Sequence, residues 1–289
     1  MIDGLAVVDK PGGMTSHDVV ARCRRIFGQR RVGHAGTLDP DATGLLLVGL
    51  GRATRLMQFM SGLDKTYEAA ILLGISTSTL DASGEVTGKW DMSRVTLDDV
   101  RRAAAGLTGA ILQVPPMVSA VKVGGRRLHA LAREGIEVER RPRPVSVHRF
   151  EVESLGESIA RATIVCSSGT YVRVLASDLG EMLGGGAHVL SLRRTAVGPW
   201  TAGDSRSLDA LERSSVVPPA QCLPWLEQVV AAGEIGPQVA NGRVLDESAL
   251  GVSGGGPWTV IDERGDLLAV YQHHTGGRVK PAVVLPSGT

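Results

Sequence analysis

The sequence predicts an α+β fold with several short strands, and three features support this. Strand-like stretches recur along the chain, as apolar runs at residues 5–8 and 45–48, a strand pattern at 63–74 and an alternating pattern at 160–166. Apolar residues at helical spacing follow residues that can start helices, at residues 15–27, 96–109 and 171–179. From about residue 223 the composition becomes Gly-rich and acidic, and a hairpin pattern at 258–272 with a further strand at 279–286 indicates a small β-rich domain.

The chain begins with a strand-turn-helix pattern. A Pro-Gly-Gly turn follows the strand at residues 5–8, and Thr15 or Ser16 can cap the helix that comes next. Gly28 can end this helix. Its apolar stripe consists of Val19, Val20, Cys23, Ile26 and Phe27.

The stretch VGHAGTLDPDATGLLLVG at residues 32–49 presents the carboxylate of Asp39 in a glycine-rich loop. Pro40 biases Asp39 toward an extended or turn conformation, and the apolar run at 45–48 anchors the loop in a core. A catalytic acid is often presented in this way. On spacing alone, an ordinary surface-turn aspartate explains the pattern about as well.

The patterns in the middle of the chain are typical of structural elements. Residues 63–74 read as a strand with Tyr67 near its start, where a tyrosine is usually a packing residue. Residues 76–86 read as a polar loop. Residues 96–109 read as a helix that opens with a capping box.

The helix predicted after residue 171 carries a cation at an electrostatically unfavourable position. Arg173 falls in its first turn, where the helix dipole does not favour a cation. We expect a partner carboxylate to resolve this.

Charge is clustered although the formal net charge is only +1. Residues 22–31 carry five arginines and no acid, and residues 122–149 carry eight Lys and Arg against three Glu, a balance of +5. Residues 223–289 carry four Lys and Arg against seven acids, a balance of −3. The sequence therefore predicts that a phosphate-binding surface lies on the first half of the chain.

Composition excludes several functional classes. The 289 residues, with 43% hydrophobic and 21% charged side chains, are typical of a globular protein, and no apolar run is long enough to span a membrane. The start of the chain lacks the features of a signal peptide, so we expect a cytoplasmic location. Three scattered cysteines and seven histidines without ligand spacing predict no disulfide framework and no metal site. The chain has no dinucleotide fingerprint and no P-loop, so we expect chemistry without a cofactor.

One family accounts for these stretches together. GHAGTLDPDATG, at residues 33–44, resembles the defining motif of the TruB-type tRNA pseudouridine synthases, which make pseudouridine 55 in the T-arm of tRNA. Further motifs of that family are matched in order over residues 5–200: DKPGGMTS at 9–16, K-x-Y at 65–67, Q-x-PP-x-x-SA-x-K at 113–122, SGTY-x-R at 168–173 and L-RR-x-x-x-G at 192–198.

The resemblance implies roles for individual residues. Asp39 is the catalytic aspartate, and Arg173 pairs with it. The residues implied to contact the target uridine are His34, which takes the place of the flipped base, Tyr67, which stacks on the uracil, and Tyr171 and Leu192, which line and close the pocket. Lys10 helps to shape the site, and Lys10, Lys122, Arg126 and Arg127 are expected to contact the RNA backbone. Three positions depart from the family pattern, namely Asp41, Val118 and His129.

The resemblance also implies the architecture and the activity. We expect a pseudouridine synthase fold at residues 1–222, a mixed and mostly antiparallel sheet with flanking helices, with a basic RNA-binding segment at about 113–149, and a PUA-like domain at 223–289. The expected reaction is stand-alone isomerisation of uridine 55 in the tRNA T-loop, by base flipping and attack by an aspartate, with no guide RNA, accessory protein or membrane. Nothing indicates an obligate interface, so we expect a monomer. Two alternatives remain: a non-catalytic tRNA-binding or tRNA-folding protein on the same scaffold, and an RNA-guided uridine-modifying enzyme.

Overall fold

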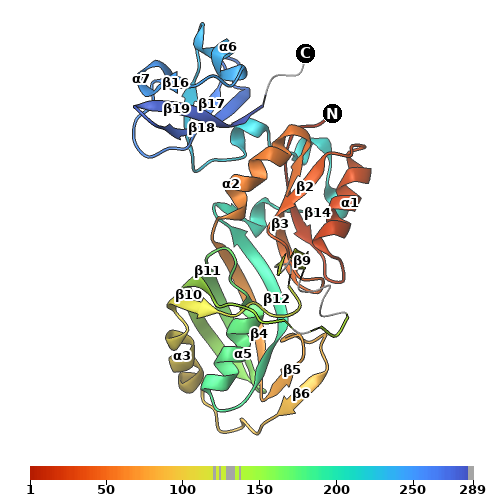
Figure 1. Ribbon diagram of the computed structural model, residues 1–289. Coiled ribbons are helices and arrows are strands. Elements are labelled where there is room, and N and C mark those ends of the chain that lie inside the picture. Colours follow the sequence, from red (N-terminus) through yellow and green to blue (C-terminus); the bar gives the residue numbers. More distant parts are fainter. Residues whose placement is uncertain (120–121, 124, 128–133, 137, 286–289) are drawn as a thin grey trace. The chain divides into compact units, whose positions relative to one another are not determined.

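The computed structural model describes residues 1–119, 122–123, 125–127, 134–136 and 138–285 (Figure 1). The chain divides into two compact units. The first consists of Met1–Pro40, Leu45–Ser61 and Pro199–Thr289, and the second of Asp41–Gly44 and Gly62–Gly198. No helix in the described part of the chain combines the length and the apolar content that crossing a bilayer requires.

The first unit begins with the predicted strand-turn-helix. Its elements are β1 (Gly4–Lys10), α1 (Ser16–Ile26), β2 (Val32–Ala35), β3 (Thr43–Leu50), a 3-10 helix (Gly51–Leu56) and α2 (Met57–Ser61). β2 pairs antiparallel with β3, and β1 pairs parallel with β14 (Arg206–Ser207). Helix α1 is N-capped by Thr15 through a full capping box with Asp18, which satisfies main-chain N–H groups that the first turn leaves open.

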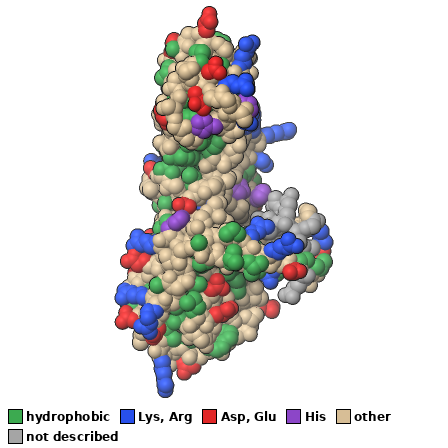
Figure 2. All heavy atoms as spheres, turned by 60° about the vertical axis from the view of Figure 1, so that its left-hand side comes forward, with side chains coloured by type: hydrophobic (Ala, Val, Ile, Leu, Met, Phe, Trp, Pro, Cys, Tyr) green, Lys and Arg blue, Asp and Glu red, His purple; other side chains and the backbone are tan. Residues whose placement is uncertain are grey.

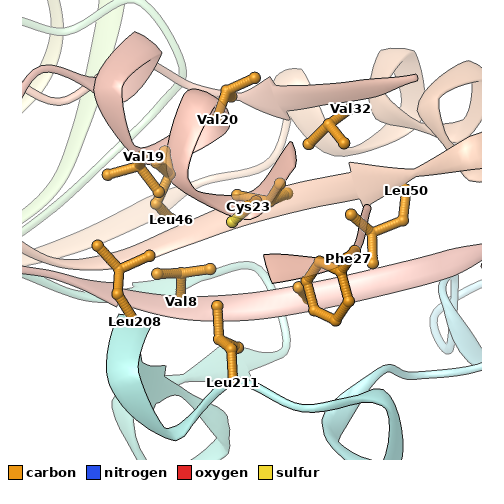
Figure 3. Close-up of a cluster of buried hydrophobic side chains, with 12 residues drawn as sticks. Val8, Val19, Val20, Cys23, Phe27, Val32, Leu46, Leu50, Leu208 and Leu211 are labelled. Carbon is orange, nitrogen blue, oxygen red and sulfur yellow. The ribbon is translucent and has the colours of Figure 1, made fainter. Parts of the chain in front are cut away.

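The apolar stripe of α1 forms one side of a core. Figure 3 shows Val19 and Cys23 of α1, and Phe27 at its C-cap, directed toward the strands that carry Val8 and Leu46. Leu208 and Leu211, from the segment after β14, belong to the same cluster, as do Val20, Val32 and Leu50. Spacing of three and four residues places these helix side chains on one face, so the predicted stripe is confirmed.

The last part of the first unit has its own sheet and core. The elements are β15 (Glu227–Val230), α6 (Ile235–Ala240), β16 (Leu245–Asp246), α7 (Glu247–Leu250), β17 (Trp258–Ile261), β18 (Leu267–His274) and β19 (Arg278–Val284), with strand order β15-β17-β18-β19-β16. Trp258 and Tyr271 lie buried at its centre, and the Tyr271 hydroxyl donates to the carbonyl of Arg243 at 2.7 Å. The predicted hairpin and final strand are confirmed. The domain boundary at residue 222 stays a prediction.

The second unit is built on antiparallel strands in the order β12-β4-β11-β10-β7. The strands are β4 (Lys65–Leu73), β7 (Gly109–Gln113), β10 (Arg143–Gly156), β11 (Ile159–Cys166) and β12 (Ala187–Val197). Helix α5 (Val172–Met182) packs on β12, helix α3 (Leu97–Gly106) packs on β10, and the two helices touch, so they cover the same face (Figure 1). Two small hairpins complete the unit, β5–β6 (Ile75–Thr77 and Val86–Lys89) and β8–β9 (Lys122–Val123 and Arg126–Arg127).

Two predictions about local structure need correction. Residues 76–86 are not one loop, because β5 and β6 take up both of its ends and leave a shorter connection. The helix predicted at 96–109 ends at Gly106, and Gly109, at φ 104°, already belongs to β7. The strands at 63–74 and 160–166 and the capping box at Thr96 are confirmed.

Candidate active site

Asp39 lies in the connection between the antiparallel strands β2 and β3 of the first unit. The chain turns at Gly36, whose φ of 77° is strained for residues with a side chain. Asp39 is partly exposed, whereas Leu38 before it is buried. Asp39 is therefore partly accessible in a loop whose preceding residue is packed in the core.

Ser16 fixes the residue before the carboxylate. Its hydroxyl accepts a hydrogen bond from the main-chain N–H of Leu38 at 2.9 Å and donates to the carbonyl of the same residue at 3.3 Å. Ser16 is 1% exposed, so water does not compete for these bonds. The first residue of α1 thus holds both main-chain groups of the residue next to Asp39.

Lys10 fixes the residue after the carboxylate. Its ammonium donates to the carbonyl of Pro40 at 2.7 Å, and also to those of Pro11 at 2.8 Å and Met14 at 2.6 Å. The side chain of Lys10 is fully buried. These contacts favour a role in holding the Asp39 loop, and the predicted contact of Lys10 with the RNA backbone stays a prediction.

His34 lies in β2, on the strand that leads to Asp39. Its ring meets the ring of His17 edge-on, with centroids 5.5 Å apart and planes at 81°. His17 is exposed in the first turn of α1. The start of α1 therefore contacts both the Asp39 loop and His34.

The second unit carries the residues expected to hold the uridine. Tyr67 in β4 pairs with Arg194 in β12, and Ala69 pairs with Leu192. Side chains of paired residues, and of residues two apart on a strand, lie on the same face of a sheet. Tyr67 and Leu192 are thus brought together on one face.

Arg173 is held in one orientation in the first turn of α5. Its guanidinium donates to the carbonyls of Thr79 and Val118, both at 2.8 Å, and it is 3% exposed. Its Nη1 also lies 3.5 Å from a carboxylate oxygen of Asp81. The Asp81 carboxylate supplies the negative charge that a cation at this end of a helix needs, in line with the expectation of a partner carboxylate.

Asp81 is a residue that the sequence reasoning missed, because it lay within a stretch predicted to be a polar loop. Its second carboxylate oxygen accepts from the hydroxyls of Thr79 and Ser83, both at 2.6 Å, and from the main-chain N–H of Ser83 at 3.1 Å. The requirement of Arg173 for a carboxylate was the available signal. The family resemblance names Asp39 as the acid that pairs with Arg173, and nothing in the sequence indicated Asp81.

Val118 departs from the family pattern, but its contact with Arg173 is unaffected by the side chain. The main-chain carbonyl makes the bond, and Val118 itself is 38% exposed.

Asp41, another departure, lines a cavity of about 380 Å³ in the second unit. Other charged residues of this cavity are Glu68, Glu153, Arg161 and Arg193, and Leu192 also lines it.

Buried cations lie beside Tyr67. Lys65 is 6% exposed and donates to the carbonyl of Leu63, and Arg194 is 1% exposed. Burial, and to a smaller extent the nearby Arg194 guanidinium, lowers the pKa of the Lys65 ammonium to about 8.

Gly44, at φ 98°, lies against Arg194 so closely that an added Cβ would stand 2.2 Å from the Arg194 carbonyl oxygen.

The segment expected to bind RNA is only partly described. Arg126 is exposed and pairs with Glu134, and the main chains of Lys122 and Arg127 pair with each other in the β8–β9 hairpin. His129 lies outside the described residues. On the face in Figure 2, Lys and Arg side chains are dispersed among Asp and Glu side chains.

Within the described residues, no group of three or more His, Cys, Asp or Glu side chains is arranged to hold a metal ion.

Comparisons with known proteins agree with the motifs. Residues 24–172 match the model for the N-terminal domain of TruB family pseudouridylate synthases, and residues 173–230 match the model for the C-terminal domain of tRNA pseudouridylate synthase B. The chain is 48% identical over 308 residues to tRNA pseudouridine synthase B of Arthrobacter sp. (strain FB24), covering 98% of this chain and 97% of the relative. It is 45% identical over 295 residues to that of Thermobifida fusca (strain YX), covering 98% of this chain and 99% of the relative.

Solved structures show the same likeness. A chain in the crystal structure of a Cbf5-Nop10-Gar1 complex superposes with a TM-score of 0.75 at 27% identity, covering 98% of this chain and 85% of that one. Together with the family models, this confirms the predicted fold.

Proposed function

The chain belongs to the TruB family of pseudouridylate synthases, and from this premise we propose that it converts uridine 55 in the T-arm of tRNA to pseudouridine, with Asp39 as the catalytic carboxylate. The observation that carries the proposal is the anchoring of the Asp39 loop. Ser16 binds the residue before Asp39 and Lys10 binds the residue after it, whereas Asp39 itself is partly exposed. A carboxylate held in this way is preorganised for a ligand that arrives from solvent.

The reaction needs one carboxylate near ribose C1′. The bond from C1′ to N1 of uracil breaks, the base turns, a new bond forms from C1′ to C5, the hydrogen at C5 leaves as a proton, and N1 takes up a proton. Asp39 either attacks C1′ or removes the proton at C2′, and both routes require its ionised form. That Arg173 pairs with Asp39 stays a prediction from the family resemblance.

The target base must leave its stack in the folded T-loop, at a cost of about a few kcal/mol. We propose that His34 fills the space the base leaves and that Tyr67 stacks on the flipped uracil, with Tyr171 and Leu192 completing the pocket. Stacking on an aromatic ring recovers part of the cost. The shared sheet face of Tyr67 and Leu192 supports this arrangement.

We also propose that the enzyme acts alone, as a cytoplasmic monomer that binds tRNA through residues 113–149. The positive balance of residues 122–149 supports the phosphate contact. The acidic residues 223–289 then position the tRNA or stabilise the catalytic domain at residues 1–222 rather than bind phosphate strongly.

The test is tritium release from tRNA labelled at uridine C5, without added metal, cofactor, guide RNA or protein. Wild type is compared with Asp39→Asn and with Asp209→Asn, a control in which an exposed carboxylate is replaced, and a tRNA lacking the T-arm uridine is included. We expect release by wild type and the control only, and only when that uridine is present. If wild type bound tRNA and released no tritium, the tRNA-folding alternative would replace the proposal.

A further inference from the structure

Gln113, at the end of β7, binds both main-chain groups of Tyr171. Its side-chain oxygen accepts from the Tyr171 N–H at 2.8 Å, and its side-chain nitrogen donates to the Tyr171 carbonyl at 3.1 Å. Gln113 is 2% exposed. The carboxamide offers one acceptor and one donor side by side, so it pairs with the main chain of Tyr171 as a residue of a neighbouring strand would.

Tyr171 is the residue at which α5 begins. Its backbone is extended, with φ −103° and ψ 106°, and no side chain caps the helix. Its carbonyl also accepts from the N–H groups of Val174 and Leu175, both at 3.1 Å. Because the next turn carries Arg173, any shift of the Tyr171 backbone moves both the tyrosine ring and the guanidinium.

The segment that follows Gln113 contacts the same helix turn a second time. The carbonyl of Val118 accepts from Arg173 at 2.8 Å, and the carbonyl of Pro115 accepts from Arg140 at 3.1 Å. One short segment therefore holds the backbone of Tyr171 at one end and the guanidinium of Arg173 at the other.

We propose that Gln113 is a positioning residue for pseudouridine formation, which orients Tyr171 and Arg173 by binding the Tyr171 main chain. The inference rests on the function proposed above. Gln113 contributes no atom to the uridine pocket in this role, so its loss slows the chemical step and leaves tRNA affinity nearly unchanged. A displacement of about 1 Å at a reacting group can cost about 100-fold in rate.

The first test measures single-turnover tritium release at saturating enzyme, the Kd for tRNA and the folded fraction for Gln113→Met, which keeps the side-chain length and removes both hydrogen bonds. The matched control is Thr259→Val, which removes another buried side-chain bond to a carbonyl, from Thr259 to Glu227 at 3.2 Å. We expect Gln113→Met to lose about 10-fold or more in rate, with the Kd within about threefold of wild type. We expect the control to stay within about twofold of wild type in rate.

The second test uses pH. Gln113→Glu keeps the acceptor for the Tyr171 N–H, but as a carboxylate it turns a second acceptor toward the Tyr171 carbonyl. Once protonated, the carboxyl has the same donor and acceptor pattern as the carboxamide. We therefore expect the rate of Gln113→Glu, relative to wild type at each pH, to recover as the pH falls from 8 to 5.5, while Gln113→Met shows no recovery.

The outcomes separate the two proposals. If wild type releases no tritium, the proposed function fails and the inference fails with it. If wild type is active and Gln113→Met is as fast, only the inference is overturned. The inference is also overturned if the rate loss equals the loss in folded fraction, or if Gln113→Glu follows the same relative pH profile as Gln113→Met.

Discussion

Replacing Ser16 by alanine tests how the Asp39 loop is held. The change removes two hydrogen bonds to Leu38 and leaves its buried N–H and carbonyl without a protein partner. Hydrogen bonds contribute about 1 kcal/mol each, and leaving a buried group unpaired costs about 1–3 kcal/mol. We expect Ser16→Ala to lower the free energy of unfolding by about 2–4 kcal/mol.

This loss leaves a folded enzyme, because a typical domain has about 5–15 kcal/mol of stability. With the base of the loop released, Asp39 is no longer aimed, and we expect the single-turnover rate to fall by about 10-fold or more. The assay is tritium release at saturating enzyme, combined with denaturant unfolding.

The control is Thr15→Ala, one residue earlier. Thr15 accepts from the Asp18 N–H at 3.1 Å and caps the same helix, and its side-chain hydrogen bonds go to Asp18 and not to Leu38. It is expected to cost about 1 kcal/mol of stability and to leave the rate unchanged. Equal rates for the two variants would refute the idea that Ser16 positions the Asp39 loop.

Three further predictions concern stability. Burial, with a smaller effect from Glu181, raises the pKa of the Asp178 carboxyl from 3.8 to about 6. The folded state therefore binds the carboxyl proton more tightly than the unfolded state does, and the stability that this binding contributes is lost as the pH rises through 6. Asp178→Asn is therefore expected to stabilise by about 1–2 kcal/mol at pH 8 and by much less at pH 4 in urea unfolding, and an equal effect at both pH values would contradict this. Because the pKa of Lys65 is lowered from 10.5 to about 8, the penalty for burying its charge disappears between these values. Wild type should then gain about 2–3 kcal/mol over Lys65→Met as the pH rises through this range, and parallel unfolding curves would argue against it. Gly44→Ala is expected to abolish folding, since its Cβ would stand 2.2 Å from the Arg194 carbonyl oxygen, whereas Gly13→Ala, at φ 78° with open space around it, should still give a native circular dichroism spectrum.

Much of the local structure could be predicted from the sequence. The helix cap at Thr15 or Ser16, the capping box at Thr96 and the apolar stripe of α1 depend on residues within a few helical turns of each other, so the pattern is complete in a short stretch. The long strand β10 was missed. Its charged and polar residues were counted as part of a basic segment, and the pattern gave no sign of its pairing with β7 and β11.

The sequence by itself determined the family, because the motifs are contiguous and ordered along the chain, and it indicated that Asp39 stands in a glycine-rich loop that leads into a strand. The tertiary structure decided which groups hold that loop and the start of α5. Ser16 meets Leu38 across 22 positions, Lys10 meets Pro40 across 30, and Gln113 meets Tyr171 across 58. Such contacts form only when separate elements pack together, and burial then removes the water that would otherwise compete for the same hydrogen bonds.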